Sequence, residues 1–238
     1  MNEFAKNWLY DEFQQTGKDY ASLEEVEIYD PSHDDFRDIA QEIREVENWI
    51  QPDKTSVLLD IGCGTGNFAL HFAKYCHHVY ALDISLPMLS LAEKKAKKEQ
   101  VNHIEFIHSG YLHFELPENH VHGVISSLSL HHLPDYWKSK ALEKIYQVLK
   151  PDGRFYLYDV IIPDHQPETS IHDFIDRQGK RGGDFLREDT IIHFKEEYST
   201  FDWIMKGLLE NAGFKILKER TYDGVLKKYF CAKPSTRS

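Results

Sequence analysis

The chain has 238 residues, of which 41% are hydrophobic and 28% are charged. This length and composition predict a folded chain with a substantial core, and we expect a single domain over residues 1–238. Lysine and arginine number 28 against 39 aspartate and glutamate residues. The formal net charge of −11 disfavours a polyanionic partner such as nucleic acid, without excluding one.

No segment approaches the ~18 consecutive apolar residues of a membrane span. The acidic N-terminus also lacks the basic start of a secretion signal, so we expect no membrane association and a cytoplasmic location. The three cysteines, Cys63, Cys76 and Cys231, form no CxxC pair. We expect reduced packing thiols in place of disulfides or a thiolate zinc site. The oligomeric state does not follow from the sequence.

Residues 1–51 are predicted to form an N-terminal helical cap. Trp8, Tyr10 and Phe13 share one helical face, and a second helix runs from a cap at Ser32 to Ile50. The aromatic residues either pack on the core or close over a pocket, and the sequence leaves both open.

Residues 52–162 alternate short apolar runs with amphipathic stretches. The runs SVLLDI, HVYALD, HIEFIHS and HGVISSLSL are typical of strands, and so is RFYLYDVII, which follows the breaker KPDG. This is the rhythm of βαβ units whose strands are apolar enough to be covered on both faces. We therefore expect a mostly parallel sheet between two helical layers.

The end of the chain departs from this rhythm. Residues 163–200 are longer than an ordinary connection, and we expect a lid or a substrate-shaping insertion, with a plain surface excursion as the alternative. Residues 201–238 are predicted to hold a last helix closed by Gly213 and an antiparallel hairpin that turns at Asp223-Gly224.

The insertion carries a group of cations in an otherwise acidic chain. They either recognise a carboxylate or phosphate on a ligand or pair with neighbouring acidic residues. The group consists of Arg177, Lys180, Arg181 and Arg187.

The stretch VLLDIGCGTGNFA ends a strand in Asp60 and then places glycines at 62, 64 and 66. In an open parallel sheet, ligands bind beyond the carboxyl ends of the strands, and glycines let the backbone approach a ligand closely. Asp83 ends the next strand, where an acid accepts hydrogen bonds from two ribose hydroxyls. The predicted ligand is a nucleoside. The pattern GxGxxA also fits a dinucleotide, whereas Asp60 suits an ammonium group better than a pyrophosphate.

Four motifs occur in order: LLDIGCGTG, ALDIS, SSLSLHHLPD and VLKPDGRFYLYD. Together they resemble the motifs of the class I S-adenosylmethionine-dependent methyltransferases of small-molecule type, closely from Thr55 to Pro163 and more loosely to the final hairpin. The resemblance implies an α/β fold, a Rossmann-like three-layer sandwich with a seven-stranded, mostly parallel sheet and a C-terminal antiparallel hairpin. It also implies methyl transfer from S-adenosylmethionine, which leaves S-adenosylhomocysteine.

The resemblance further implies which residues hold the cofactor, from the methionine end through the ribose to the adenine and the floor near the sulfonium. They are Asp60, Gly62, Cys63, Gly64, Gly66, Asp83, Ile84, Met88, Gly110, Tyr111, Leu112, Ser127 and Leu128. Two motifs depart from the family pattern. Gly110-Tyr111 stands where many relatives have Gly-Asp, and Val121-His122 where they often have Phe-Asp. Without the first acid, the adenine is left to backbone groups or to Tyr111.

Transfer of a methyl group from a sulfonium is an in-line displacement, which requires mainly that the two reactants be held in position. His131 and His132 are the candidates for a base, and a structural role is the alternative. Asp159 either touches the substrate or has a structural use.

No metal site is predicted, because the sequence has neither HExxH nor a Cys/His ligand set. The other paired histidines border predicted strands, and we expect solvated turns there. They are His77, His78, His120 and His122.

The leading hypothesis is therefore a methyltransferase with an unidentified, small-molecule acceptor. A non-catalytic S-adenosylmethionine-binding sensor is an alternative that the missing acid favours. A methyltransferase acting on RNA or protein would require a basic face on the insertion. A nicotinamide oxidoreductase would require dinucleotide binding.

Overall fold

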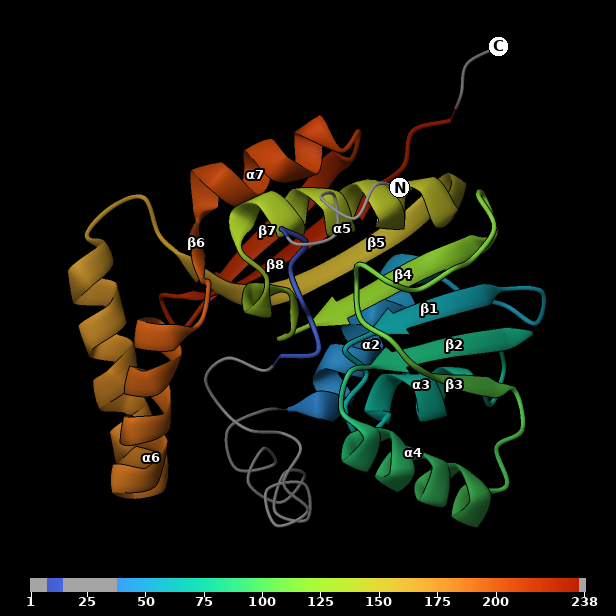
Figure 1. Ribbon diagram of the computed structural model, residues 1–238, viewed down its shortest axis with the longest axis horizontal. Coiled ribbons are helices and arrows are strands. Elements are labelled where there is room, and N and C mark those ends of the chain that lie inside the picture. Colours follow the sequence, from blue (N-terminus) through green and yellow to red (C-terminus); the bar gives the residue numbers. More distant parts are fainter. Residues whose placement is uncertain (1–7, 15–37, 236–238) are drawn as a thin grey trace.

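The computed structural model describes residues 8–14 and 38–235. One sheet crosses the molecule in the strand order β3-β2-β1-β4-β5-β8-β7, with the short β6 paired to β5 (Figure 1). The strands are β1 (Val57–Ile61), β2 (His78–Asp83), β3 (Ile104–His108), β4 (Val121–Ser127), β5 (Leu149–Ile162), β6 (Thr200–Phe201), β7 (Lys215–Tyr222) and β8 (Leu226–Ala232). Strands β1 to β5 pair in parallel, and β8 runs antiparallel to β5 and β7. This arrangement confirms the predicted α/β fold with its terminal antiparallel hairpin.

Helices cover both faces of the sheet. α5 and α7 lie on one face, and α2, α3 and α4 lie on the other (Figure 1). All five residues of β1 are buried, as expected for a strand that packs against helices on both sides. The helices are α2 (Ile39–Ile50), α3 (Asn67–Phe72), α4 (Leu86–Glu99), α5 (Asp135–Val148), α6 (Pro167–Glu196) and α7 (Asp202–Asn211), with a short 3-10 helix, η2 (Leu130–His132).

Local signals set several element boundaries. The carboxylate of Asp38 accepts a hydrogen bond from the Gln41 amide at 2.8 Å and caps α2, whereas the predicted cap at Ser32 lies outside the described residues. Gly213 ends the region of α7 with a φ of 102°, as predicted. Asp223 and Gly224 both have positive φ and form the predicted hairpin turn.

The predicted N-terminal helix is wrong for residues 8–14, which form irregular turns. Several of their side chains contact remote parts of the molecule. Trp8 packs against Trp137 with ring centroids 5.5 Å apart, and the Tyr10 hydroxyl donates to the His132 carbonyl at 3.1 Å. These tertiary contacts hold a conformation that helical spacing does not anticipate.

The predicted breaker KPDG does not precede β5 but lies within it. Val121 pairs with Leu149 and Gly123 with Arg154, so the four intervening residues of β5 bulge out of the ladder. Asp152 adopts a φ of 62° there, and its amide donates to the Lys233 carbonyl at 3.0 Å. Lys233, which follows β8, thus forms backbone hydrogen bonds with this bulge that an isolated turn would not have.

His122 does not lie in a solvated turn either. It is a half-buried residue of β4, and its Nδ1 accepts from the Val57 amide at 3.0 Å. Lys150 approaches its Nε2 at 2.9 Å. Val121, one residue before the predicted run HGVISSLSL, already pairs with Leu149, so His122 lies within β4 and not at its border.

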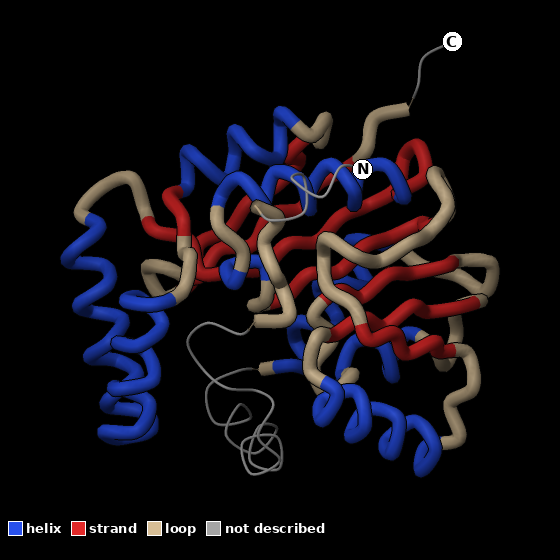
Figure 2. Tube along the Cα trace, viewed as in Figure 1, coloured by secondary structure: helices blue, strands red, loops and turns tan. Residues whose placement is uncertain are grey.

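The insertion forms two helical segments that fold back on each other and stand apart from the main helical layers (Figure 2). The kink lies at Gly182 and Gly183, where Gly183 has a φ of 67°. Among the helices of residues 38–235, none has the length and apolar composition needed to cross a bilayer.

Candidate functional site

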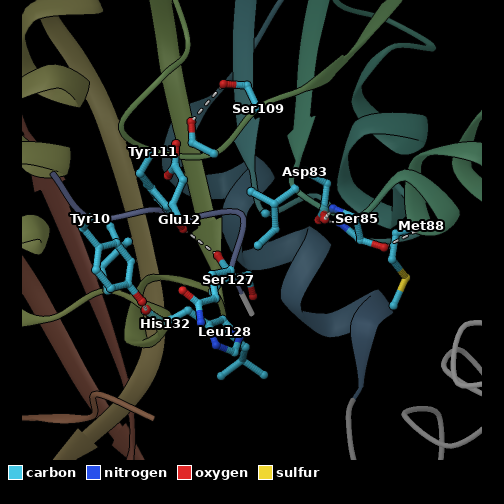
Figure 3. A pocket seen from close by; sticks show the side chains of 17 residues that line it. Tyr10, Glu12, Asp83, Ser85, Met88, Ser109, Tyr111, Ser127, Leu128 and His132 are labelled. Atoms are coloured by element: carbon cyan, nitrogen blue, oxygen red, sulfur yellow. Dashed lines mark hydrogen bonds between the residues drawn. The ribbon is translucent and has the colours of Figure 1, made fainter. Parts of the chain in front are cut away.

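A cavity of about 110 Å³, the first cavity, opens at the carboxyl ends of β1, β2 and β4. Tyr10 and His132 lie on one side of it, and Asp83, Ser85 and Met88 on the other (Figure 3). Its lining includes nine of the residues predicted to bind a nucleoside cofactor: Gly62, Gly64, Asp83, Ile84, Met88, Gly110, Tyr111, Ser127 and Leu128.

Two glycines shape the loop between β1 and α3. At Gly62, φ is 69°, and a Cβ would overlap the side chain of Ser129. At Gly64, φ is 53°, and a Cβ would meet nothing within 4 Å, because this part of the backbone faces open space. Glycine is therefore needed at 62 for close packing and backbone conformation, and at 64 for conformation.

Asp83 ties the end of β2 to this loop. Its Oδ2 accepts from the Gly64 amide and its Oδ1 from the Ser85 amide, each at 2.8 Å. Burial raises the pKa of the carboxyl, although these amide hydrogen bonds oppose the rise. The side chain is thus held rigidly on the cavity wall, with lone pairs left on both oxygens for further donors.

Tyr111 also lines the first cavity. Its hydroxyl lies 2.7 Å from Ser126 Oγ and 2.5 Å from Ser129 Oγ, and burial raises its pKa. Ser129 Oγ also donates to the Ile61 carbonyl at 3.2 Å. The phenol therefore links the ends of β1 and β4, and this network already engages the group that the sequence offered for an adenine.

Glu12 enters the first cavity from the N-terminal segment, and nothing in the sequence pattern predicted it. Its carboxylate accepts from the amides of Leu112 and His113 at 3.0 to 3.1 Å. The side chain of Glu12 is 3% exposed and lies so close to Gly110 that a Cβ on this glycine would overlap it. The segment thus places a carboxylate beside the Gly-Tyr pair that lacks one.

Four predicted cofactor residues do not line the cavity. Asp60 is buried within β1, and Cys63 packs in the core on the α3 side, where burial raises the pKa of its thiol. Gly66 adjoins Ala92 of α4, and Leu112 contributes its amide to Glu12. Asp60, Cys63 and Gly66 thus shape or support the glycine loop and Leu112 holds Glu12, whereas their neighbours form the cavity wall.

A second cavity, of about 470 Å³, lies between the sheet and the insertion. Leu128 borders both cavities. Residues of α2, β5, α6 and the β7–β8 turn make most of its wall, among them Glu42, Tyr158, Gln178, Thr190 and Asp223. Arg181 lines it too, but its guanidinium binds Asp223 at 2.7 Å, so the structure favours intramolecular pairing for this cation.

The two histidines predicted as bases have different surroundings. His132 lines the first cavity, and burial, together with the charge of His131, lowers its pKa to about 3. His131 lines the second cavity between Asp159 and Glu197. Burial disfavours its charged form, but the two carboxylates outweigh burial and raise its pKa to about 10. Asp159 is 1% exposed and serves His131 from within the core.

The family model and the relatives that this chain resembles are those of methyltransferases. The model of a methyltransferase domain matches residues 58–153. An uncharacterized methyltransferase of Geobacillus sp. (strain WCH70) is 28% identical over 191 residues, which cover 80% of this chain and 83% of the relative.

Two solved structures share the fold. A SAM dependent methyltransferase from Aquifex aeolicus superimposes with a TM-score of 0.62 at 18% identity, covering 89% of this chain and 98% of its own. Geranyl diphosphate C-methyltransferase from Streptomyces coelicolor A3(2), solved with Mg²⁺, geranyl diphosphate and S-adenosyl-L-homocysteine, gives a TM-score of 0.65 at 10% identity. That alignment covers 82% of this chain and 78% of the other.

Proposed function

Because residues 58–153 form a domain of the methyltransferase family, we propose that this protein transfers a methyl group from S-adenosylmethionine to a small-molecule acceptor. The observation that carries the proposal is the wall of the first cavity. A fixed carboxylate, Asp83, stands there between the open backbone at Gly64 and the apolar side chains of Ile84 and Met88. This is the polarity that a nucleoside with a charged tail requires.

The residues fit the cofactor from end to end. Each oxygen of Asp83 already accepts one amide and can accept one ribose hydroxyl in addition. Ile84 and Met88 would pack on the adenine, and the backbone at Gly62 and Gly64 would hold the methionine part. Asp60, behind the loop, would contribute a negative charge toward the ammonium group without direct contact.

Glu12 would supply the acceptor that Gly110-Tyr111 lacks. Its carboxylate is fixed by the Leu112 and His113 amides on the same side of the cavity as Gly110. A carboxylate oxygen retains a further lone pair for the adenine amino group. The N-terminal segment would thus take over the role that an acid after the third strand has in many relatives.

When bound, S-adenosylmethionine supplies an electrophilic methyl group on a sulfonium. The chain's own part is to hold the acceptor in line with that methyl group and to exclude water. Tyr10 covers one side of the first cavity through its hydrogen bond to the His132 carbonyl. His132 is uncharged near neutral pH because burial lowers its pKa, so it is a weak base. Positioning is therefore the main device.

Calorimetric titration with S-adenosylhomocysteine tests the proposal. We expect the wild type to bind and Asp83→Ala to bind at least tenfold more weakly, about 1.4 kcal/mol. Asp173→Ala, at an exposed position of α6, is the matched control and should bind as the wild type does. Circular dichroism establishes that both variants are folded.

The pH dependence of the same titration gives a second test. Because its pKa is raised, the Asp83 carboxylate becomes protonated at a higher pH than an ordinary aspartate does. Affinity should therefore decline as the pH falls toward that value, because a protonated carboxyl accepts ribose hydroxyls less well, and Asp83→Asn should lack this decline. Absence of binding by folded wild-type protein would refute the proposal. Binding without acceptor-dependent formation of S-adenosylhomocysteine would instead favour a sensor.

A further inference from the structure

Three imidazoles and two carboxylates meet where the two cavities adjoin. η2 contributes His131 and His132, β5 contributes Asp159, and the end of α6 contributes His193 and the following Glu197. The ring centroids of His131 and His132 lie 4.3 Å apart, and those of His131 and His193 lie 4.8 Å apart. Within residues 8–14 and 38–235, His131, His132 and Glu197 each place one ligand atom within 4.8 Å of the others.

The rings are oriented from behind. Asp159 accepts from His131 Nδ1, while its carboxylate also accepts the amides of His131 and Val160 at 3.1 and 2.8 Å. This leaves His131 Nε2 facing Glu197 Oε2 at 3.2 Å. A carboxylate often accepts from one ring nitrogen of a metal-ligating histidine in this way. It sets the orientation of the ring and leaves the other nitrogen available for the metal.

Glu197 is approached from two sides by imidazole nitrogens. Its Oε2 contacts His193 Nδ1 as well as His131 Nε2, and the other nitrogen of His193 lies 2.8 Å from Ser199 Oγ. Two imidazoles converge on one carboxylate oxygen, and a third is within reach. Borderline divalent ions such as Zn²⁺ bind such a set of nitrogen and oxygen donors more readily than Mg²⁺ or Ca²⁺ do.

The backbone holds these donors together although they are distant in sequence. The Tyr198 amide donates to the His131 carbonyl at 2.9 Å, and Thr200 pairs with Ile161 in the β5–β6 ladder. The Lys138 ammonium donates to the Tyr198 carbonyl at 2.5 Å. The segment that carries Glu197 is therefore fixed against η2, which is the preorganisation that a metal site requires.

Burial and charge favour a cation at this point. The side chains of His131, Asp159 and Glu197 are 8%, 1% and 5% exposed. Two carboxylates in so little water require compensation by positive charge. A divalent ion between neutral imidazoles would balance both charges and replace the proton shared between His131 and Glu197.

From this geometry we propose that a divalent transition-metal ion, with Zn²⁺ as the probe of choice, binds His131, His132 and Glu197, with His193 adjacent. His132 lines the first cavity, whereas His131, His193 and Glu197 line the second. The ion would stand between them and bind an oxygen or nitrogen of a ligand in the second cavity. That this ligand is the methyl acceptor rests on the proposed function, whereas binding of the ion does not.

The test is a titration of the full chain, freed of metal by a chelator, with Zn²⁺ in competition with a chromophoric chelator. We expect one ion per chain in the wild type and at least about tenfold weaker binding in His131→Asn and in Glu197→Gln. His172→Asn is the matched control, since His172 lies on α6 with a side chain that is 76% exposed, and it should retain wild-type affinity.

A spectrum of the wild type with Co²⁺ keeps the proposal testable if a variant fails to fold. Visible ligand-field bands of a site with nitrogen and oxygen ligands are expected, and they should vanish on addition of one equivalent of Zn²⁺. Sub-stoichiometric Zn²⁺ binding by the wild type, or equal affinities in His131→Asn, Glu197→Gln and His172→Asn, would overturn the proposal. All measurements are made without S-adenosylhomocysteine, so failure here is separate from failure of cofactor binding.

Discussion

The two cavities are built in different ways. The first draws most of its wall from strand ends and the turns that follow them between residues 62 and 133, together with the N-terminal segment. The second draws its wall from α2, β5, α6 and the terminal hairpin, which are far apart in sequence. Short sequence motifs define the wall of the first cavity, whereas the wall of the second cavity depends on how the insertion packs against the sheet. Substitutions should therefore have sharper, more local effects in the first cavity.

The largest effect is expected at the glycine loop. Gly62→Ala places a Cβ on a residue with a φ of 69°, where it overlaps Ser129. The backbone strain and the overlap together should lower the free energy of unfolding by about 2–4 kcal/mol. Gly207→Ala is the control, because this glycine lies in α7 with nothing within 4 Å of the added Cβ, and it should stabilise by about 0.5–1 kcal/mol. Denaturant unfolding measures both. A Gly62→Ala variant as stable as the wild type would show that the loop adapts.

An intermediate effect is expected at the remote contribution to the same cavity. Glu12→Ala should weaken S-adenosylhomocysteine binding about tenfold, since a hydrogen bond to a charged acceptor contributes roughly 1.5–3 kcal/mol and part of it is regained from water. Calorimetry measures the change, with the exposed Glu115→Ala as control. Tighter binding by Glu12→Ala would reverse the interpretation, because Glu12 would then compete with the ligand for the Leu112 and His113 amides.

The smallest effect is expected where the insertion meets the hairpin. Asp223 binds Arg177 and Arg181 at 2.6 and 2.7 Å, and both arginine side chains are partly exposed. Asp223→Asn should lower stability by at most about 1 kcal/mol at low salt and by less at high salt, while hydrogen exchange in α6 accelerates. Asp152→Asn is matched in its positive φ and should leave α6 unchanged. Unaltered exchange in α6 would show that apolar packing around Phe174, and not the ion pairs, holds the insertion.

Local chemistry made the fold readable. The apolar runs that end in Ile61 and Asp83, and the turn at Asp223-Gly224, depend on residues close together in the sequence, and the structure has strands and a turn where the pattern indicated them, with β1 one residue longer than predicted. The bulge in β5 and the partial burial of His122 were not predicted, because the pairing of Val121 with Leu149 and the contact of Asp152 with Lys233 are long-range.

By itself, the sequence determined the order of strands and helices in the core and the position of the glycine loop, because backbone conformation and the alternation of apolar runs are controlled by neighbours along the chain. The resemblance to the methyltransferases, and not this alternation, named the nine predicted residues that line the first cavity. Only the tertiary structure placed Glu12 beside Gly110, divided His131 from His132 between two cavities, and brought Glu197 to His131. Each of these depends on a contact between segments that are distant in the sequence. No sequence pattern indicates which distant segments meet, so the packing of the folded chain decides it.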